Sequence, residues 1–359
     1  MAFPRARRLP LLLCAVGVVA LAGEGRARAG RNDLRLLNLC PYDPNTLECS
    51  WIQRNGDGSV RETTFDGDAQ SRFRSLMSEL GFAIAPRVLT PADTLGFAGF
   101  QFSAELGITN INSTRKIGTP GNQLAYWNGV ETFDPTAPTA RHADTHLTTV
   151  GGFVRKGLWL PLPAFEFGAG ALSIVGSRMY VLQGYAKLAL QEGFHGWWLP
   201  SFAVRGGASQ LLGTSEVDLT VYSVDVIASK AFDIGGTARI EPFLGWSMLF
   251  IKATSSVIDA TPNCDAFASP GDPAPSPQCA ASQAGDGNDA NAVFQFPEQD
   301  VITRQRFFGG FKLKMSVLFL AAQAEFALAG TSRDSMQTAR AADKSAAQQT
   351  YSLSAGFDF

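Results

Sequence analysis

The chain contains 359 residues, which is enough for one large domain or for two of ordinary size. Charged residues make up 17% and hydrophobic residues 45%, a mixture too apolar for a disordered chain. A formal net charge of -2 gives no electrostatic reason to expect a nucleic-acid partner. The 36 glycines and 26 phenylalanines are compatible with a chain rich in β-structure.

Residues 1–29 have the features of a secretory signal peptide. A positive start, with arginines at positions 5, 7 and 8, precedes an apolar stretch from Leu11 to Leu21. Small residues then offer cleavage sites after Ala22 or after Ala29. The apolar stretch is too short for a membrane anchor, since a helical span needs about 20 apolar residues. We therefore expect an exported protein.

Four cysteines follow the signal peptide, in two local pairs. Cys40 lies close to Cys49, and Cys264 lies close to Cys279, so two local disulfides are predicted for an oxidising compartment. Zinc is a poor alternative, because neither pair has Cys-x-x-Cys spacing or a nearby histidine. We expect no metal and no cofactor.

From residue 97 onward, hydrophobic and polar residues alternate with the period of two that is typical of β-strands. No segment after the signal peptide reaches the 18 uncharged apolar residues of a transmembrane helix. Ten strands are predicted, at roughly 97–110, 145–156, 164–175, 178–191, 197–209, 217–230, 237–252, 302–314, 318–329 and 350–359. For the strands at 145–156, 197–209 and 217–230, the sequence does not decide which side chains face outward and which face inward.

The connections between these strands differ in length from one side to the other. Polar and mostly long connections follow the first, fifth, seventh and ninth strands, whereas 157–163, 192–196, 231–236 and 315–317 are short. Transmembrane barrels have this asymmetry, with short periplasmic turns and longer extracellular loops. A soluble β-sandwich would not need the long loops on one side, and its outer face would be polar.

The last ten residues alternate and end on an aromatic side chain, through Tyr351, Leu353, Phe357 and Phe359. This segment resembles the terminal strand of bacterial outer-membrane β-barrel proteins, which the β-barrel assembly machinery reads as its signal. The resemblance covers about ten residues and points to no particular family. It implies an all-β, closed antiparallel transmembrane barrel, formed by residues 97–359, in the lipid of a Gram-negative outer membrane.

The face opposite the apolar one should line the lumen of this barrel. Ten strands imply a narrow or plugged lumen, since wide aqueous pores need about 16–18. Bases and acids are nearly balanced there, which predicts a salt-bridged interior, with an anion-attracting constriction around 304–314 as the alternative. The predicted lumen-lining residues are Glu105, Glu166, Lys187, Arg205, Asp225, Arg239, Glu241, Arg304, Arg306, Lys312, Lys314 and Glu325.

Residues 30–96 do not read as barrel strands. Apolar positions at 73, 76, 77 and 80 predict a short helix over 71–81. We expect this segment to plug the lumen from the periplasm or to lie beneath it. Residues 82–89 could instead form an extra strand that, with a partner from 34–39, would give twelve strands.

Catalysis has one weak candidate. His142, Asp144 and His146 share one face if extended, near the end of a long loop. Some ten-stranded outer-membrane proteins are surface proteases with Asp/His pairs at the rim, but their motifs are absent here. We predict no catalytic residue. A narrow or gated channel for small solutes is the first functional hypothesis, a structural or surface-interaction barrel the second, and a rim enzyme the third.

Overall fold

The computed structural model describes residues 32–40, 42–43, 48–56, 60–66, 68–111, 145–158, 164–192, 198–260, 292–335 and 341–359. The predicted signal peptide, Cys264, Cys279, His142 and Asp144 lie outside these residues. In the described part of the chain, no helix is long and apolar enough to cross a membrane.

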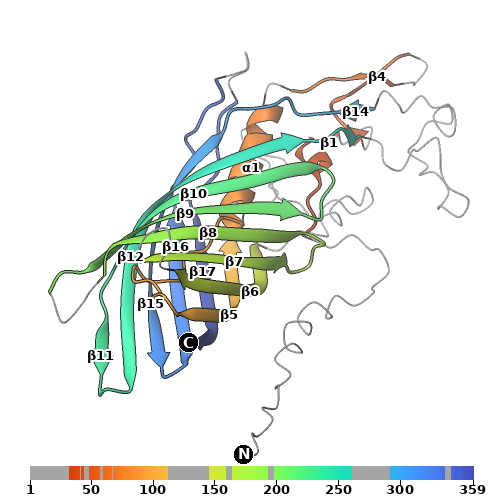
Figure 1. Cartoon of the computed structure of the whole chain (residues 1–359). Coiled ribbons are helices and arrows are strands. Elements are labelled where there is room, and N and C mark those ends of the chain that lie inside the picture. The colour runs from red at the N-terminus through yellow and green to blue at the C-terminus, as the bar shows by residue number, and fades with distance from the viewer. Residues whose placement is uncertain are drawn as a thin grey trace, which may run out of the picture.

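Ten long antiparallel strands close into a barrel (Figure 1). Neighbours in sequence pair with each other, and closure comes from the pairing of the last strand with the first. A short strand, β11 (Phe232–Ile234), pairs with the start of β12. The barrel strands are β5 (Phe100–Asn110), β6 (His146–Leu158), β7 (Phe165–Ile174), β8 (Tyr180–Gln191), β9 (Ser201–Leu212), β10 (Val217–Ser229), β12 (Ala238–Ser255), β15 (Ile302–Met315), β16 (Leu318–Ala327) and β17 (Gln348–Asp358).

These strands confirm the predicted closed barrel of ten strands and exclude the twelve-stranded alternative. Residues 84–95 carry no strand and lie inside the barrel, while 36–39 form a short 3-10 helix, η2 (Leu36–Leu39). The physical reason is that Pro86 has no N–H for a ladder and that wall side chains, rather than a neighbouring strand, bond the carbonyls of this stretch.

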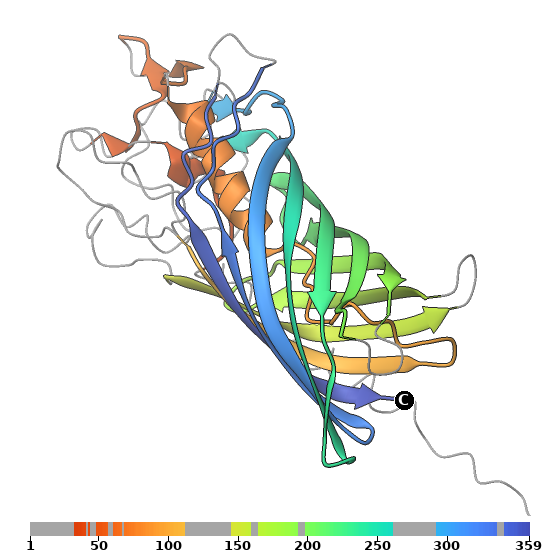
Figure 2. The same cartoon turned by 90° about the vertical axis from the view of Figure 1, so that its left-hand side faces the viewer.

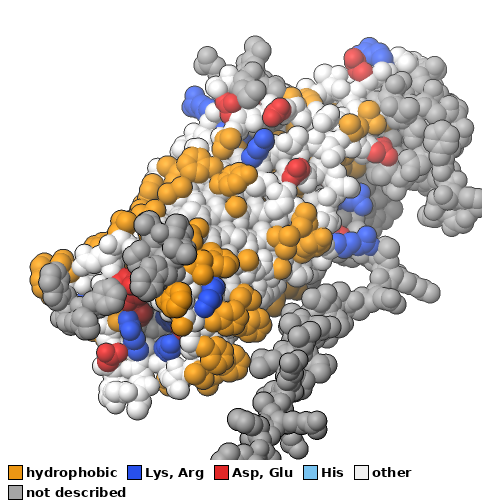
Figure 3. Space-filling view, viewed as in Figure 1, with side chains coloured by type: hydrophobic (Ala, Val, Ile, Leu, Met, Phe, Trp, Pro, Cys, Tyr) orange, Lys and Arg blue, Asp and Glu red, His pale blue; other side chains and the backbone are white. Residues whose placement is uncertain are grey.

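The outer wall is apolar over its whole middle. Outward positions such as Phe102, Leu182, Phe307, Phe311 and Leu353 are exposed, and they alternate with buried inward positions. Figure 3 shows hydrophobic side chains across the wall, with charged ones gathered mainly toward its two ends. Such a surface is unfavourable in water and is typical of a wall that faces lipid.

The two ends of the barrel differ. We call the end with the connections 111–145, 175–179, 213–216, 256–301 and 328–347 the long-loop end, and the opposite one the short-turn end. The chain terminus at Phe359 lies at the short-turn end, beside the start of β5. Figure 2 shows the C-terminus and the helix α1 (Ala69–Ala83) at opposite ends of the barrel.

The described residues between 32 and 68, which we call the cap, lie at the long-loop end, where the strands β1 (Tyr42–Asp43), β2 (Glu48–Cys49), β3 (Ile52–Arg54) and β4 (Val60–Thr63) form two small hairpins. The predicted Cys40–Cys49 disulfide is present. Trp51 and Phe65 of the cap pack against Phe296 of the loop that follows β12, and Phe73 of α1 stacks on the same ring at 4.6 Å. That loop also carries β13 (Ile258–Asp259) and β14 (Val293–Phe294).

The core of the protein lies within the barrel. The helix α1 extends the predicted 71–81 by two residues at each end and is buried on nearly every side. In the long-loop half, inward side chains such as Leu219, Val221, Leu249 and Ile251 belong to the same apolar cluster as α1. Gly81 permits this close approach, because a Cβ there would lie 2.7 Å from Ile251. The apolar inner wall of this half explains why the helix packs in the long-loop half of the lumen.

Candidate functional site in the lumen

Strand parity brings the predicted charged residues to the inner wall. On β15, Arg304, Arg306 and Lys312 are buried inward, while Phe307 and Phe311 are exposed. The same alternation buries the other predicted residues, except that Arg239 and Lys314 are partly exposed at the short-turn end. The residues buried in this way are Glu105, Glu166, Lys187, Arg205, Asp225, Glu241, Arg304, Arg306, Lys312 and Glu325.

Ion pairs between strands connect these side chains. Asp225 lies between two arginines, with Arg205 Nε at 2.8 Å and Arg306 Nη2 at 3.2 Å. Arg306 also bonds Glu325 on β16 at 3.0 Å. All four side chains are almost completely buried, where a charge without a partner would be costly. The Asp225 cluster thus joins β9 and β10 to β15 and β16, across the intervening strand β12.

Residues 84–95, which we call the lumen segment, run through the middle of this network. Arg205 donates to the carbonyls of Arg87 and Pro86, at 2.6 and 3.2 Å, and Arg306 donates to that of Pro86 at 2.8 Å. The side chain of Arg87 bonds Thr149 on β6. The same arginines that pair with Asp225 therefore also hold the chain inside the barrel.

Amide side chains of the wall hold the lumen segment in the same manner. Gln183 on β8 donates to the carbonyls of Ile84 and Ala85, at 2.9 and 3.2 Å. Gln323 on β16 accepts from the N–H of Leu89 at 2.6 Å. Leu89 has a φ of 41°, a left-handed conformation that is costly for leucine and persists where the surroundings impose it. The lumen segment is thus fixed in one conformation from both sides.

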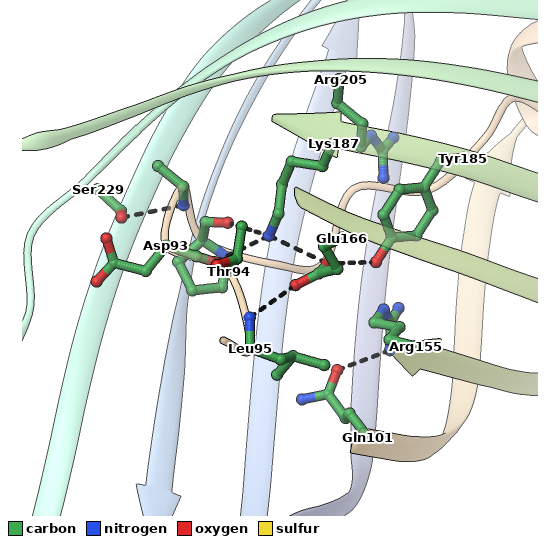
Figure 4. A network of polar contacts seen from close by, with 12 residues as sticks. Asp93, Thr94, Leu95, Gln101, Arg155, Glu166, Tyr185, Lys187, Arg205 and Ser229 are labelled. Atoms are coloured by element: carbon green, nitrogen blue, oxygen red, sulfur yellow. Dashed lines mark hydrogen bonds and ion pairs between the residues drawn. The ribbon is translucent and has the colours of Figure 1, made fainter. Parts of the chain in front are cut away.

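The short-turn half of the segment is held by Glu166 and Lys187 (Figure 4). These two side chains pair at 3.1 Å and are both buried. Lys187 donates to the carbonyls of Pro91 and Asp93, at 3.1 and 2.9 Å, and Glu166 accepts from the N–H of Leu95 at 3.1 Å. Figure 4 shows Tyr185 bonded to the same carboxylate. Charges on the wall therefore supply the polar partners that this stretch of backbone would otherwise lack.

A polar cavity of about 210 Å³ opens below the segment at the short-turn end. Lys312 and Lys314 both pair with Asp358, at 2.5 and 2.9 Å, and Arg239 pairs with Asp93 at 3.0 Å. Each cation of this cavity thus has a carboxylate partner. Arg304 and Arg306 are bonded too, Arg304 to the carbonyl of Ser78 in α1 and Arg306 to Glu325. These bonds weaken the alternative hypothesis that residues 304–314 form an anion-attracting constriction.

Arg155 and the lumen segment were not predicted from the sequence as parts of the lumen. Arg155 on β6 lies in the lumen and pairs with Glu105 at 2.5 Å. Its strand gave no clear face because Gly151 and Gly152 interrupt the alternation, although the register opposite Gln101 would have shown it. The lumen segment has no periodicity, so its path could not be read from its residues.

The cap is latched to the barrel rim by polar contacts. Asn32 bonds the carbonyls of Val175 and Gly176, at 3.1 and 3.0 Å. The carboxylate of Glu216 accepts from the N–H of Leu36 at 2.5 Å and pairs with Arg35 at 3.7 Å. Burial raises the pKa of Glu216 above its ordinary value, although both partners favour the charged form. The N-terminal part of the chain is therefore bonded to the barrel at the rim, through the cap, as well as inside the lumen.

The described residues give no further support to the hypothesis of a rim enzyme. His146, the one described member of the predicted His/Asp group, is exposed and bonded to Thr145. The described residues contain no cluster of three or more potential metal ligands. The lumen network combines charge with burial, but its groups bond each other and the chain that fills the barrel.

No protein-family model matches the chain, and a search of curated proteins finds no match. Among solved structures, it is similar to Ail, the attachment invasion locus protein of Yersinia pestis, with 11% identity over 73% of this chain and 99% of that one, and a TM-score of 0.23. Neisserial surface protein A has 11% identity over 72% and 95%, with a TM-score of 0.25. The translocator domain of autotransporter NalP from Neisseria meningitidis has 10% identity over 82% and 96%, with a TM-score of 0.26.

Proposed function

We propose that the protein is an outer-membrane barrel with a closed lumen that acts at the cell surface, through the cap and the loops of its long-loop end. We propose the orientation that is usual for such barrels, in which the short turns face the periplasm and the long loops face the outside of the cell. The observation that carries the proposal is the lumen segment, whose backbone is bonded to Arg205, Arg306, Gln183 and Lys187.

A gated channel, the first hypothesis from the sequence, becomes the second candidate. A channel would open only if the lumen segment moved out of the barrel. The ion pairs of Asp225 and Glu166 would then be exposed to water in an open passage. The observation in its favour is that the wall would remain polar and charged in the short-turn half. Against it, withdrawal also breaks the contacts of α1 with its apolar surroundings, which is a large loss of buried area.

Chloride flux into liposomes distinguishes the two candidates. Purified protein is placed in vesicles that contain a halide-sensitive dye, and quenching reports entry. We expect the full-length protein to admit chloride no faster than protein-free vesicles. A variant in which the signal peptide is joined directly to Phe97 lacks the cap, α1 and the lumen segment, so it should admit chloride faster. Rapid entry through the full-length protein would favour the channel and contradict the closed lumen.

A further inference from the structure

The part of the chain that fills the barrel begins at one end of the barrel and finishes at the other. Asn32 is bonded at the long-loop rim, whereas Phe100 begins β5 at the short-turn end, bonded to Phe359 at 3.0 Å. Between them, α1 occupies the long-loop half of the lumen and residues 84–95 occupy the other half. The chain therefore passes once through the barrel before it forms the first strand (Figures 1 and 2).

The cap is a folded unit at that far end. It has the Cys40–Cys49 disulfide, and Trp51 and Phe65 form an aromatic cluster with the loop after β12. Asp33 accepts from the N–H of Arg178 at 2.7 Å, and Glu216 holds Leu36. These contacts hold the cap at the long-loop end of the barrel.

A non-helical stretch such as residues 84–95 is not stable in the hydrocarbon core by itself, because its unpaired backbone N–H and C=O groups would have no hydrogen-bond partners there. Within the described barrel, the polar inner wall supplies such partners: Gln183, Gln323 and Lys187 bond the backbone of the crossing chain. The middle of the outer wall instead presents apolar side chains, such as Phe102, Leu182 and Leu353. The route of residues 32–68 to the far side therefore runs inside the barrel, not beside it.

We propose that this barrel carries its own N-terminal segment across the membrane, so that a peptide joined ahead of Asn32 is displayed at the outer face. The inference rests on the proposed orientation, with short turns toward the periplasm. The barrel thereby has a transport activity directed at its own chain rather than at free solutes.

Epitope accessibility on intact cells tests this. One full-length variant carries the epitope between the signal peptide and Asn32. Two controls carry it at exposed turns: between Thr214 and Ser215 at the long-loop end, and between Gly235 and Gly236 at the short-turn end. Assembly of each is checked by heat-modified gel mobility. We expect antibody to bind the first two variants on intact cells at full signal, and added protease to remove their epitopes. The third should react only after permeabilisation.

The outcomes separate the two proposals. If the Thr214 epitope is accessible and the one ahead of Asn32 is protected until permeabilisation, the display inference is overturned while the orientation stands. If the Gly235 epitope is accessible on intact cells and the Thr214 epitope is not, the orientation itself is wrong and both proposals fall. Cleavage of the N-terminal epitope at the surface, with the barrel still assembled, supports the inference.

Discussion

Replacement of Asp225 by alanine should strongly destabilise the barrel. Its carboxylate is fully buried and accepts bonds from Arg205, Arg306, Ser223 and Ser247. Without it, Arg205 loses its carboxylate partner, and Arg306 keeps only Glu325 as a carboxylate partner. Removal of one partner from a buried pair costs about 3–5 kcal/mol, so the free energy of unfolding should fall by that order.

Urea titration of the detergent-solubilised protein, followed by gel mobility of folded and unfolded forms, measures this effect. Asp233→Ala is the matched control, since Asp233 is exposed on β11 and its loss should change the free energy of unfolding by less than about 0.5 kcal/mol. If the Asp225 variant unfolded at the same urea concentration as the control, the ion pairs of Asp225 would not stabilise the barrel.

The double change of Lys312 and Lys314 to glutamate should reduce stability and leave the lumen closed. Both lysines bond Asp358 on the terminal strand, and Lys312 is the more buried of the two. Two new carboxylates would then face Asp358 and lie in the same cavity as Glu241. For Lys312 the loss is about 3–5 kcal/mol, whereas the half-exposed Lys314 adds less because solvent screens its pair.

Lys344→Glu provides the comparison, because Lys344 pairs with Asp68 at the exposed long-loop end and should contribute about 0–1 kcal/mol. The same urea titration compares the three proteins, and the chloride assay is run on each. Altered anion selectivity of an open passage, with unchanged stability, would show instead that the lysines border a conducting path.

Much of the wall could be predicted because a strand has a period of two and a lipid-facing side. On β15 that parity placed Phe311 outward and Lys312 inward, as the structure has them. Strands with glycine pairs were less tractable: β9 was expected over 197–209 and runs from Ser201 to Leu212, with Gly206 and Gly207 at its centre. A residue without a side chain gives no sign of the face it occupies.

The contents of the lumen depend on contacts that local sequence does not encode. The helix α1 could be predicted from apolar spacing, but its position follows from Leu249, Ile251 and other inward residues more than a hundred positions away. Pro86 and Arg87 offer carbonyls that any donor could bond, and only closure of the barrel brings Arg205 and Arg306 to them. The side chains that line the lumen were therefore predictable, while their partner inside it was not.

A cross-link between the lumen segment and the wall tests the closed lumen most directly. A Cβ built at Gly207 lies 2.9 Å from Cβ of Pro86, so cysteines at both positions need a shift of only about 1 Å to reach disulfide geometry. Gly206, the neighbour on the outer face, has no atom within 4 Å of such a Cβ and serves as the control with Pro86→Cys. In assembled protein from cells, mass spectrometry should find residues 86 and 207 linked, and 86 and 206 not linked. Free thiols at 86 and 207 that react with a membrane-impermeant reagent would contradict a barrel filled by its own chain.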